Sequence, residues 1–186
     1  MKKSHRHERR FQGEADRLRS AERIALLEVD RVVALSMEGL ATVGSVLDVG
    51  TGTGVFAESF SKLVPAVTGI DTNPELLGIA RDFVPGAQFQ EAPAEKIPLA
   101  DHSFDLVFLG HVLHETDSPL KALKEARRVA GSRVVILEWP YLEEEQGPPL
   151  EHRLRPEVIE DLAGKANFRL VECIKLAHMD LYRLTL

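Results

Sequence analysis

A short apolar run followed by alternating glycines constrains this chain more than any other feature of its sequence. Residues 46–49 have the composition of a buried strand, and Gly50, Gly52 and Gly54 follow at every second position. Glycine adopts positive φ easily and lets a ligand approach the backbone without meeting a Cβ. Residues 55–64 predict a helix, whose unpaired N–H groups and positive dipole end would face that ligand. The pattern predicts a nucleotide-type site at the carboxyl end of a first parallel strand.

Strand-like and helix-like segments alternate along most of the chain. The strands expected are Ser45–Val49, Ala66–Ile70, Ala87–Gln90, Phe104–Leu109 and Arg133–Glu138. Prolines at the first helical position indicate helices that begin at Pro74, Pro119 and Pro156. Ser20 is the expected N-cap of an earlier helix with apolar residues at helical spacing: Leu26, Val29, Val33 and Met37. Such alternation predicts a parallel sheet with helices on both faces.

The end of the chain departs from this alternation. Residues 168–175 and 181–186 both have strand character, and about five residues separate them. A parallel crossover needs at least ~10 residues, so these two strands are expected to pair antiparallel. The fold class expected is α/β, with five parallel strands followed by an antiparallel hairpin.

Length and composition fit one ordinary globular domain. Of the 186 residues we assign 1–19, which are charged, to an N-terminal arm that belongs to a lid or is disordered, and 20–186 to the domain. A net charge of −6 argues against a nucleic-acid partner. Because no stretch reaches the ~20 apolar residues of a membrane span, we expect a cytoplasmic protein. The single cysteine, Cys173, lies in an apolar run and is expected in the core.

Two ligand classes compete for the glycine-rich site. An acid after the second strand, here Asp71, can accept hydrogen bonds from ribose hydroxyls in either class. The spacing Gly-x-Gly-x-Gly differs from the dinucleotide fingerprint Gly-x-Gly-x-x-Gly. Asp48 would repel a pyrophosphate and favour a cationic ligand, and the closing hairpin is foreign to the dinucleotide fold. The balance favours a methyl donor of sulfonium type over a nicotinamide dinucleotide.

The sequence from about residue 11 onward resembles the class I S-adenosylmethionine-dependent methyltransferases, most closely the small-molecule branch with the ubiquinone and menaquinone biosynthesis enzymes. The resemblance is carried by five segments: Val46–Gly54, Gly69–Asp71, Pro98–Val107, Val112–His114 and Arg127–Val129. It implies a Rossmann-like seven-stranded sheet in the order 3-2-1-4-5-7-6 with strand seven antiparallel. It also implies S-adenosylmethionine as cofactor and S-adenosylhomocysteine as product.

The resemblance further implies which residues hold the methyl donor. Gly50, Thr51 and Gly52 would cradle its methionine part, and Asp48 would hold the ammonium group through the loop or a water. The remaining residues are Asp71 for the ribose with Thr72 and Asn73 beside it, Ala94 for the adenine, and Gly110 and His111 for the sulfonium end. Where the family has an acid for the adenine amino group this chain has Pro93, and either Glu91 or Glu95 is expected to replace it.

Two histidines are candidates for a general base. His111 and His114 are three residues apart, which would place both imidazoles on one helix face. A zinc site would need further ligands, and no spacing ties His152 or His178 to the pair, so no metal is expected. A base is required only if the acceptor is a poor nucleophile.

The function expected is methyl transfer to a small molecule whose identity, like the oligomeric state, the sequence leaves open. Two alternatives remain: a non-catalytic module that binds the donor, and an NAD-dependent oxidoreductase. Tyr141 and Arg153 also leave alternatives open, since each could face a substrate or serve only the packing of its own segment.

Overall fold

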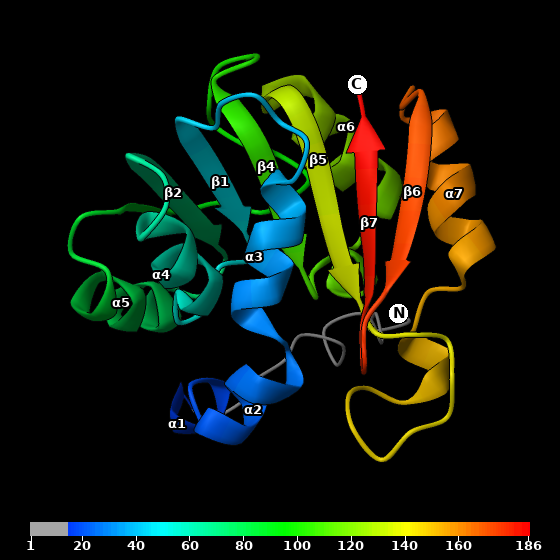
Figure 1. The fold of residues 1–186 in the computed structure, drawn as a ribbon, viewed down its shortest axis with the longest axis horizontal. Coiled ribbons are helices and arrows are strands. Elements are labelled where there is room, and N and C mark those ends of the chain that lie inside the picture. Colours follow the sequence, from blue (N-terminus) through cyan, green and yellow to red (C-terminus); the bar gives the residue numbers. More distant parts are fainter. Residues whose placement is uncertain (1–14) are drawn as a thin grey trace, which may run out of the picture.

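The computed structural model describes residues 15–186, which form a seven-stranded sheet with helices on both faces (Figure 1). The strands are β1 (Ser45–Val49), β2 (Ala66–Asp71), β3 (Gln88–Glu91), β4 (Phe104–Gly110), β5 (Ala130–Glu138), β6 (Leu170–Lys175) and β7 (Asp180–Thr185). Their order is β3-β2-β1-β4-β5-β7-β6, and β7 runs antiparallel to β5 and β6. The predicted α/β class and strand order are confirmed.

The helices divide between the two faces of the sheet. They are α1 (Ala15–Leu18), α2 (Ala21–Leu26), α3 (Val29–Met37), α4 (Val55–Ser61), α5 (Pro74–Phe83), α6 (Pro119–Val129) and α7 (Pro156–Lys165), with the 3-10 turns η2 (Leu113–Glu115) and η3 (Leu150–His152). One core cluster joins α3 and α4 to the sheet, and the other joins α6 and α7 to the opposite face. Within residues 15–186 no helix has the length and apolar character that a membrane crossing needs.

The helix starts follow local chemistry. Proline occupies the first turn of α5, α6 and α7, where its missing N–H costs no helical hydrogen bond. Asn73 caps α5 by accepting from the N–H groups of Glu75 and Leu76. After α7, Asn167 takes φ of 64°, a left-handed conformation that ends the helix. Sequence signals of this kind explain why these elements were predictable.

The prediction of one continuous helix after Ser20 is wrong, because the structure has two helices there, α2 and α3. Ser20 does cap α2, its side chain accepting from the Arg23 N–H, but the chain breaks at Glu28 before α3 begins. Glu28 has φ of 47°, which an L-residue with a long side chain rarely adopts. Its carboxylate accepts from the distant Ala177 N–H and from Arg31, so tertiary contacts override the helical period. Of the predicted arm, residues 1–14 lie outside the described part of the chain, and Ala15–Leu18 form α1.

Two further expectations are corrected at the sheet. β5 begins at Ala130, directly after α6, because Ala130 pairs with Phe104 across an irregularity in the β4 register. Cys173 is exposed rather than buried, because it lies on β6, the strand at the edge of the sheet. An edge strand covered on one side leaves alternate residues open to solvent.

Residues 139–153 form a long loop that one buried arginine organises. Arg153 donates to four backbone carbonyls, those of Pro140, Leu142, Gln146 and Pro148. Its guanidinium also lies 5.6 Å from the ring centroid of the buried Trp139. The alternative in which Arg153 serves its own loop is therefore the one that the structure supports.

We expect Arg153→Met to lower the free energy of unfolding by about 3 kcal/mol, because four buried or half-buried carbonyls lose a charged donor. Urea titration would measure the loss. Arg155→Met is the matched control, since Arg155 is exposed two residues away and should cost less than about 0.5 kcal/mol. Equal losses in the two variants would contradict this role of Arg153.

Candidate functional site

The loop after β1 lies at the centre of the sheet, where β1 pairs in parallel with β2 and β4. Gly50 and Gly52 have φ of +68° and +55°, and α4 begins at Val55. A Cβ on Gly50 would come within 1.9 Å of Val112 Cγ2, so only glycine fits under that side chain. Among residues 15–186, no atom outside Gly52 and its chain neighbours lies within 4 Å of a Cβ placed on Gly52. The backbone at Gly52 therefore presents an open face at the carboxyl edge of the sheet, as a ligand cradle requires.

Asp48 lies beneath this loop rather than facing outward. Its side chain is 1% exposed, and the Thr51 hydroxyl donates to its Oδ2 at 2.7 Å. Burial raises the pKa of Asp48 to about 7, although the hydrogen bonds from Thr51 and the Ala57 N–H act in the opposite direction. The nearby charge of Asp71 raises the pKa further. Asp48 thus braces the loop from beneath through Thr51.

Asp71 connects the loops after β1 and β2. Its Oδ2 accepts from the Gly52 N–H at 2.9 Å, and its Oδ1 accepts from the Asn73 N–H at 2.8 Å. Each carboxylate oxygen has a second lone pair, so both can still accept from a diol. Asn73 is committed to capping α5, whereas Thr72 is exposed. The predicted neighbourhood of the Gly-rich loop and the acid of the second strand is present in the structure.

The two acids flanking Pro93 occupy different positions. Glu95 Oε1 accepts from the N–H groups of Asp117 and Ser118 at 2.8 and 3.3 Å, so Glu95 serves the start of α6. Glu91 is exposed and pairs with Asp71 in the β2–β3 register. Ala94 is buried beside them. Glu95 is therefore committed to the start of α6, whereas Glu91 is exposed at the end of β3.

His111 directly follows β4, the strand that pairs with β1. Its N–H donates to the Leu137 carbonyl at 2.8 Å, and its ring stacks on Trp139 with centroids 5.2 Å apart. Nε2 lies 3.1 Å from the sulfur of Met179. Burial, reinforced by the charge of Arg23, moves the pKa of His111 well below its ordinary value. His111 is consequently a neutral ring at physiological pH.

His114 has a different environment, because it is paired with a buried carboxylate. The ring Nδ1 of His114 lies 2.6 Å from Glu138 Oε2, and the backbone N–H of His114 donates to Glu138 Oε1 at 3.2 Å. Burial alone would lower the pKa of His114, but the charge of Glu138 and the hydrogen bond outweigh it and raise that pKa. Glu138 was not among the expected site residues. The available signal was an acid ending a buried strand, the same position that Asp71 has in β2.

The two histidines do not share a helix face as expected. His111 has φ of 57° and lies before η2, whereas His114 lies within it. In residues 15–186 no group of three or more His, Cys, Asp or Glu side chains is arranged to hold a metal. The Trp139 indole covers His111, and Tyr141 stacks against the Arg155 guanidinium at 4.9 Å.

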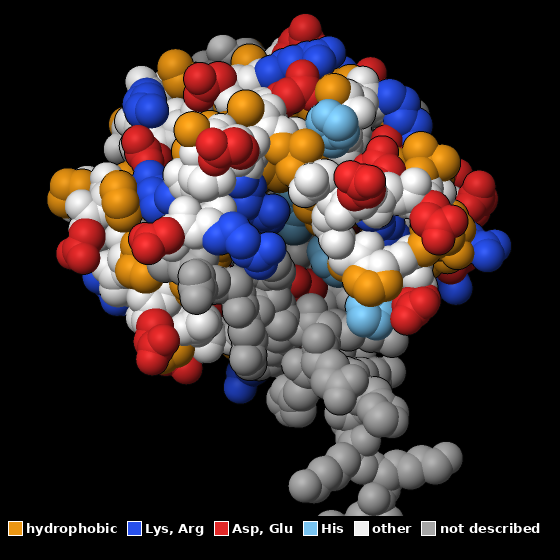
Figure 2. Space-filling view, turned by 90° about the horizontal axis from the view of Figure 1, so that it is seen from below, with side chains coloured by type: hydrophobic (Ala, Val, Ile, Leu, Met, Phe, Trp, Pro, Cys, Tyr) orange, Lys and Arg blue, Asp and Glu red, His pale blue; other side chains and the backbone are white. Residues whose placement is uncertain are grey.

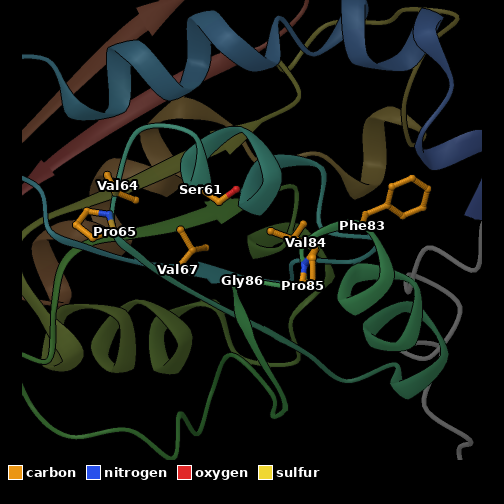
Figure 3. Close-up of a pocket in the computed structure, with 8 residues that line it drawn as sticks. All are labelled: Ser61, Val64, Pro65, Val67, Phe83, Val84, Pro85 and Gly86. Atoms are coloured by element: carbon orange, nitrogen blue, oxygen red, sulfur yellow. The ribbon is translucent and has the colours of Figure 1, made fainter.

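Two hollows lie at different ends of the sheet. A hollow of about 550 Å³ lies beyond the carboxyl end of β5 and is lined by Tyr141, Arg155, Lys175 and Asp180, among others. A smaller one of about 260 Å³, drawn in Figure 3, lies between the end of α4 and the end of α5. It includes Val67 near the start of β2, whereas Asp71 ends that strand. The smaller hollow is therefore at the opposite end of β2 from the Gly52 crevice.

Comparison with known proteins agrees with this geometry. Residues 47–136 match the sequence model of the methyltransferase domain family. A demethylmenaquinone methyltransferase of Chlorobaculum parvum is 45% identical over 85 residues, which are 45% of this chain and 35% of that protein. The ubiquinone/menaquinone biosynthesis C-methyltransferase UbiE of Geobacter is 34% identical over 131 residues, or 63% of this chain and 56% of that protein. The chain thus spans about a third to a half of the curated relatives it matches.

One solved structure matches over the whole chain. The SAM-dependent methyltransferase of Aquifex aeolicus has a TM-score of 0.83 and 26% identity, covering 99% of this chain and 100% of that one. Fold, glycine loop and sequence matches agree that this chain resembles class I of the S-adenosylmethionine-dependent methyltransferases, for which S-adenosylmethionine is the methyl donor. Within that class the chain resembles the UbiE enzymes. The resemblance inferred from the sequence is confirmed.

Asp48 should make the stability of the protein depend on pH in an unusual direction. Because its pKa is raised to about 7, the native state keeps a proton that the unfolded chain releases near pH 4. The free energy of unfolding of the wild type should therefore fall by up to about 4 kcal/mol between pH 4 and 7, relative to that of Asp48→Asn. Above pH 7 the difference between the two proteins should be constant. Urea titrations from pH 4.5 to 8.5 would measure it.

Asp161→Asn is the control for that series, since Asp161 is exposed and pairs only with Lys165 one helical turn away. The buried position assigned to Asp48 would be contradicted if the difference in the free energy of unfolding between Asp48→Asn and wild type did not vary with pH. It would also be contradicted if that difference increased as the pH falls.

Proposed function

We propose that this protein transfers a methyl group from S-adenosylmethionine to a small-molecule acceptor in the cytoplasm, leaving S-adenosylhomocysteine. The observation that carries the proposal is the open backbone face at Gly52, joined to the Asp71 carboxylate by a 2.9 Å hydrogen bond. This arrangement puts a cradle without side chains next to an acceptor for a ribose diol. The methyltransferase relatives support the same conclusion.

The residues present fit the donor group by group. The backbone of Gly50–Gly52 would hold the methionine part, with Asp48 acting on its ammonium from beneath the loop. Asp71 would bind the ribose beside Thr72 and Asn73. For the adenine we propose the Ala94 N–H and an acid, with Glu91 in better position than Glu95. Gly110 and His111 would line the sulfonium end.

When bound, S-adenosylmethionine supplies a methyl group on a cationic sulfur that is already activated for attack by a nucleophile. The protein's task is then to orient the acceptor and exclude water. A protonated imidazole beside a sulfonium would be repelled. The lowered pKa of His111 keeps its ring neutral, and its stacking on Trp139 fixes the ring in place.

We assign the general base to His114 and the orientation of its ring to Glu138. A carboxylate bound at Nδ1 holds the imidazole so that Nε2 is the nitrogen available to accept a proton. Glu138 also favours the imidazolium that forms when the proton arrives, as the raised pKa of His114 reflects. His111 has no such partner, since its Nε2 faces the sulfur of Met179.

Ligand binding tests the donor site directly. At about 100 Kd, S-adenosylhomocysteine should stabilise the protein by roughly 2.7 kcal/mol, and NAD should not. Asp71→Asn should lower the affinity for S-adenosylhomocysteine by about ten- to a hundredfold, because a charged hydrogen-bond acceptor is lost. Calorimetry would measure the change. Glu75→Gln, an exposed carboxylate in the first turn of α5, should bind normally.

Three outcomes separate the alternatives. Stabilisation by NAD alone would favour an oxidoreductase and contradict the proposal. Binding of S-adenosylhomocysteine without methylation of any lysate metabolite, followed with isotopically labelled donor, would favour a non-catalytic binding module. Binding together with a metabolite that gains one labelled methyl would support the proposal and name the acceptor.

The base assignment predicts a titration that needs no acceptor. Nitrogen-detected NMR should find the pKa of the His114 imidazole above its ordinary value and lowered in Glu138→Gln. With an acceptor in hand, the rate should rise with pH through that pKa, and the rise should move to lower pH in the variant. His111→Asn should leave the pH at which the rate rises unchanged. If the rise of the rate with pH shifts in His111→Asn and not in Glu138→Gln, the assignment is overturned.

A further inference from the structure

The segment Arg19–Leu27, which we call the strap, lies below the carboxyl edge of the sheet (Figure 1). At its start Arg19 donates from Nη1 to the Thr53 carbonyl at 2.8 Å. The same guanidinium pairs with Glu58 of α4 and lies 3.6 Å from the ring centroid of Phe83 at the end of α5. One side chain therefore joins the strap to the glycine loop and to both helices beside it.

The strap extends to the other side of the crevice. Arg23, one helical turn after Arg19, interacts electrostatically with Glu115 of η2 and contributes to the lowered pKa of His111. The strap thus contacts the loop after β1 through Arg19, and Arg23 is within electrostatic range of the loop after β4. Figure 2, viewed from this edge, shows Lys and Arg side chains beside a hollow in which histidine side chains are visible.

The strap is held by few contacts of the kind that stabilise the core. The α2 helix within it has six residues and none of them is buried. A helix of this length is marginal in water without tertiary packing. By contrast α3, which follows, buries Val32 and Val33 completely. Elements with little buried apolar surface are those that open at low cost.

A hinge is present where the strap meets α3. Leu27 is buried, and Glu28 follows it with φ of 47°. A non-glycine residue in the left-handed region stores backbone strain, and a change in its φ and ψ would swing α2 while α3 stays packed. Contacts of the Glu28 carboxylate with Ala177 and Arg31 hold the hinge residue itself to the body of the domain.

We propose that Arg19 is a positioning residue that latches the strap onto the glycine loop, so that donor and product exchange only when the strap opens at Glu28. The inference rests on the proposed function, because it takes the Gly52 crevice as the donor site. The latch acts on Thr53, one residue beyond Gly52, so closure of the strap and binding of a ligand at the glycine loop are coupled. By reciprocity the closed strap raises the affinity for the ligand, and release is slow because the strap must open first.

Dissociation of S-adenosylhomocysteine, followed by stopped-flow displacement, tests the latch. Arg19→Ala should dissociate on the order of ten times faster than wild type, the change that loss of one charged hydrogen bond of about 1.4 kcal/mol would give. Arg19→Lys should be intermediate, since an ammonium can keep the Glu58 pair but cannot also stack on Phe83 and reach Thr53. Hydrogen exchange in residues 20–27 should slow when ligand binds and accelerate in Arg19→Ala.

Arg127→Ala is the matched control. Arg127 also donates to a backbone carbonyl, that of Asn167, and lies 6.0 Å from the ring centroid of Phe168, far from the strap on α6. It should leave ligand dissociation unchanged. If Arg19→Ala folds poorly, Phe83→Ala, which truncates an exposed ring, should still release the ligand faster than wild type.

The two proposals fail in different ways. Wild-type protein that does not bind S-adenosylhomocysteine overturns the proposed function and the latch with it. Wild-type protein that binds normally, with dissociation from Arg19→Ala or Phe83→Ala no faster than from wild type, overturns the latch alone. Faster dissociation in both, with Arg127→Ala unchanged, supports it.

Discussion

The hydrogen bond from the Gly52 N–H to the Asp71 carboxylate is the contact on which the arrangement of this edge depends. It joins a loop that only positive φ angles permit to the end of the neighbouring strand. The same loop is fixed from beneath by Asp48 and Thr51, and from above by the close approach of Val112 to Gly50. A site built in this way is rigid where the backbone must face a ligand, and it leaves side chains out of the space the ligand needs.

The buried acids among residues 15–186 differ in whether a cationic group is paired with them. Glu138 pairs with His114 on β5, and Asp180, opposite Glu138 on β7, pairs with Lys175. Asp48 has only neutral donors, and its raised pKa is the consequence. Paired buried charges are tolerated, whereas an unpaired one takes up a proton. The crevice beside Gly52 therefore borders on a carboxylate whose charge a cationic ligand would promote, which suits a sulfonium compound that also carries an ammonium group.

How far the sequence predicts this structure depends on the range of the interactions concerned. Glycines after an apolar run, prolines at helix starts and an acid after the second strand are local signals, and they predicted the α/β class and the meeting of the loop with Asp71. The strand order was implied by the family resemblance. Other features depend on contacts between residues distant in the sequence: the break at Glu28, the pairing of Glu138 with His114 and the loop around Arg153. Such contacts leave no periodic pattern or motif in the sequence. The exposure of Cys173 was mispredicted for the same reason, because strand composition does not reveal which strand is at the edge.

Arg19 illustrates why such residues matter for function. From the sequence it is one charge among many in a basic arm, yet its guanidinium contacts the loop, α4 and α5 at once. A ligand buried in a crevice must also leave it, so part of the wall has to open without disturbing the core. The α2 helix meets that requirement because none of its residues is fully buried, and the strained Glu28 separates it from the well-packed α3. Local instability at the strap and rigidity at the glycine loop are therefore complementary, since each would be of little use to a methyl-transfer site without the other.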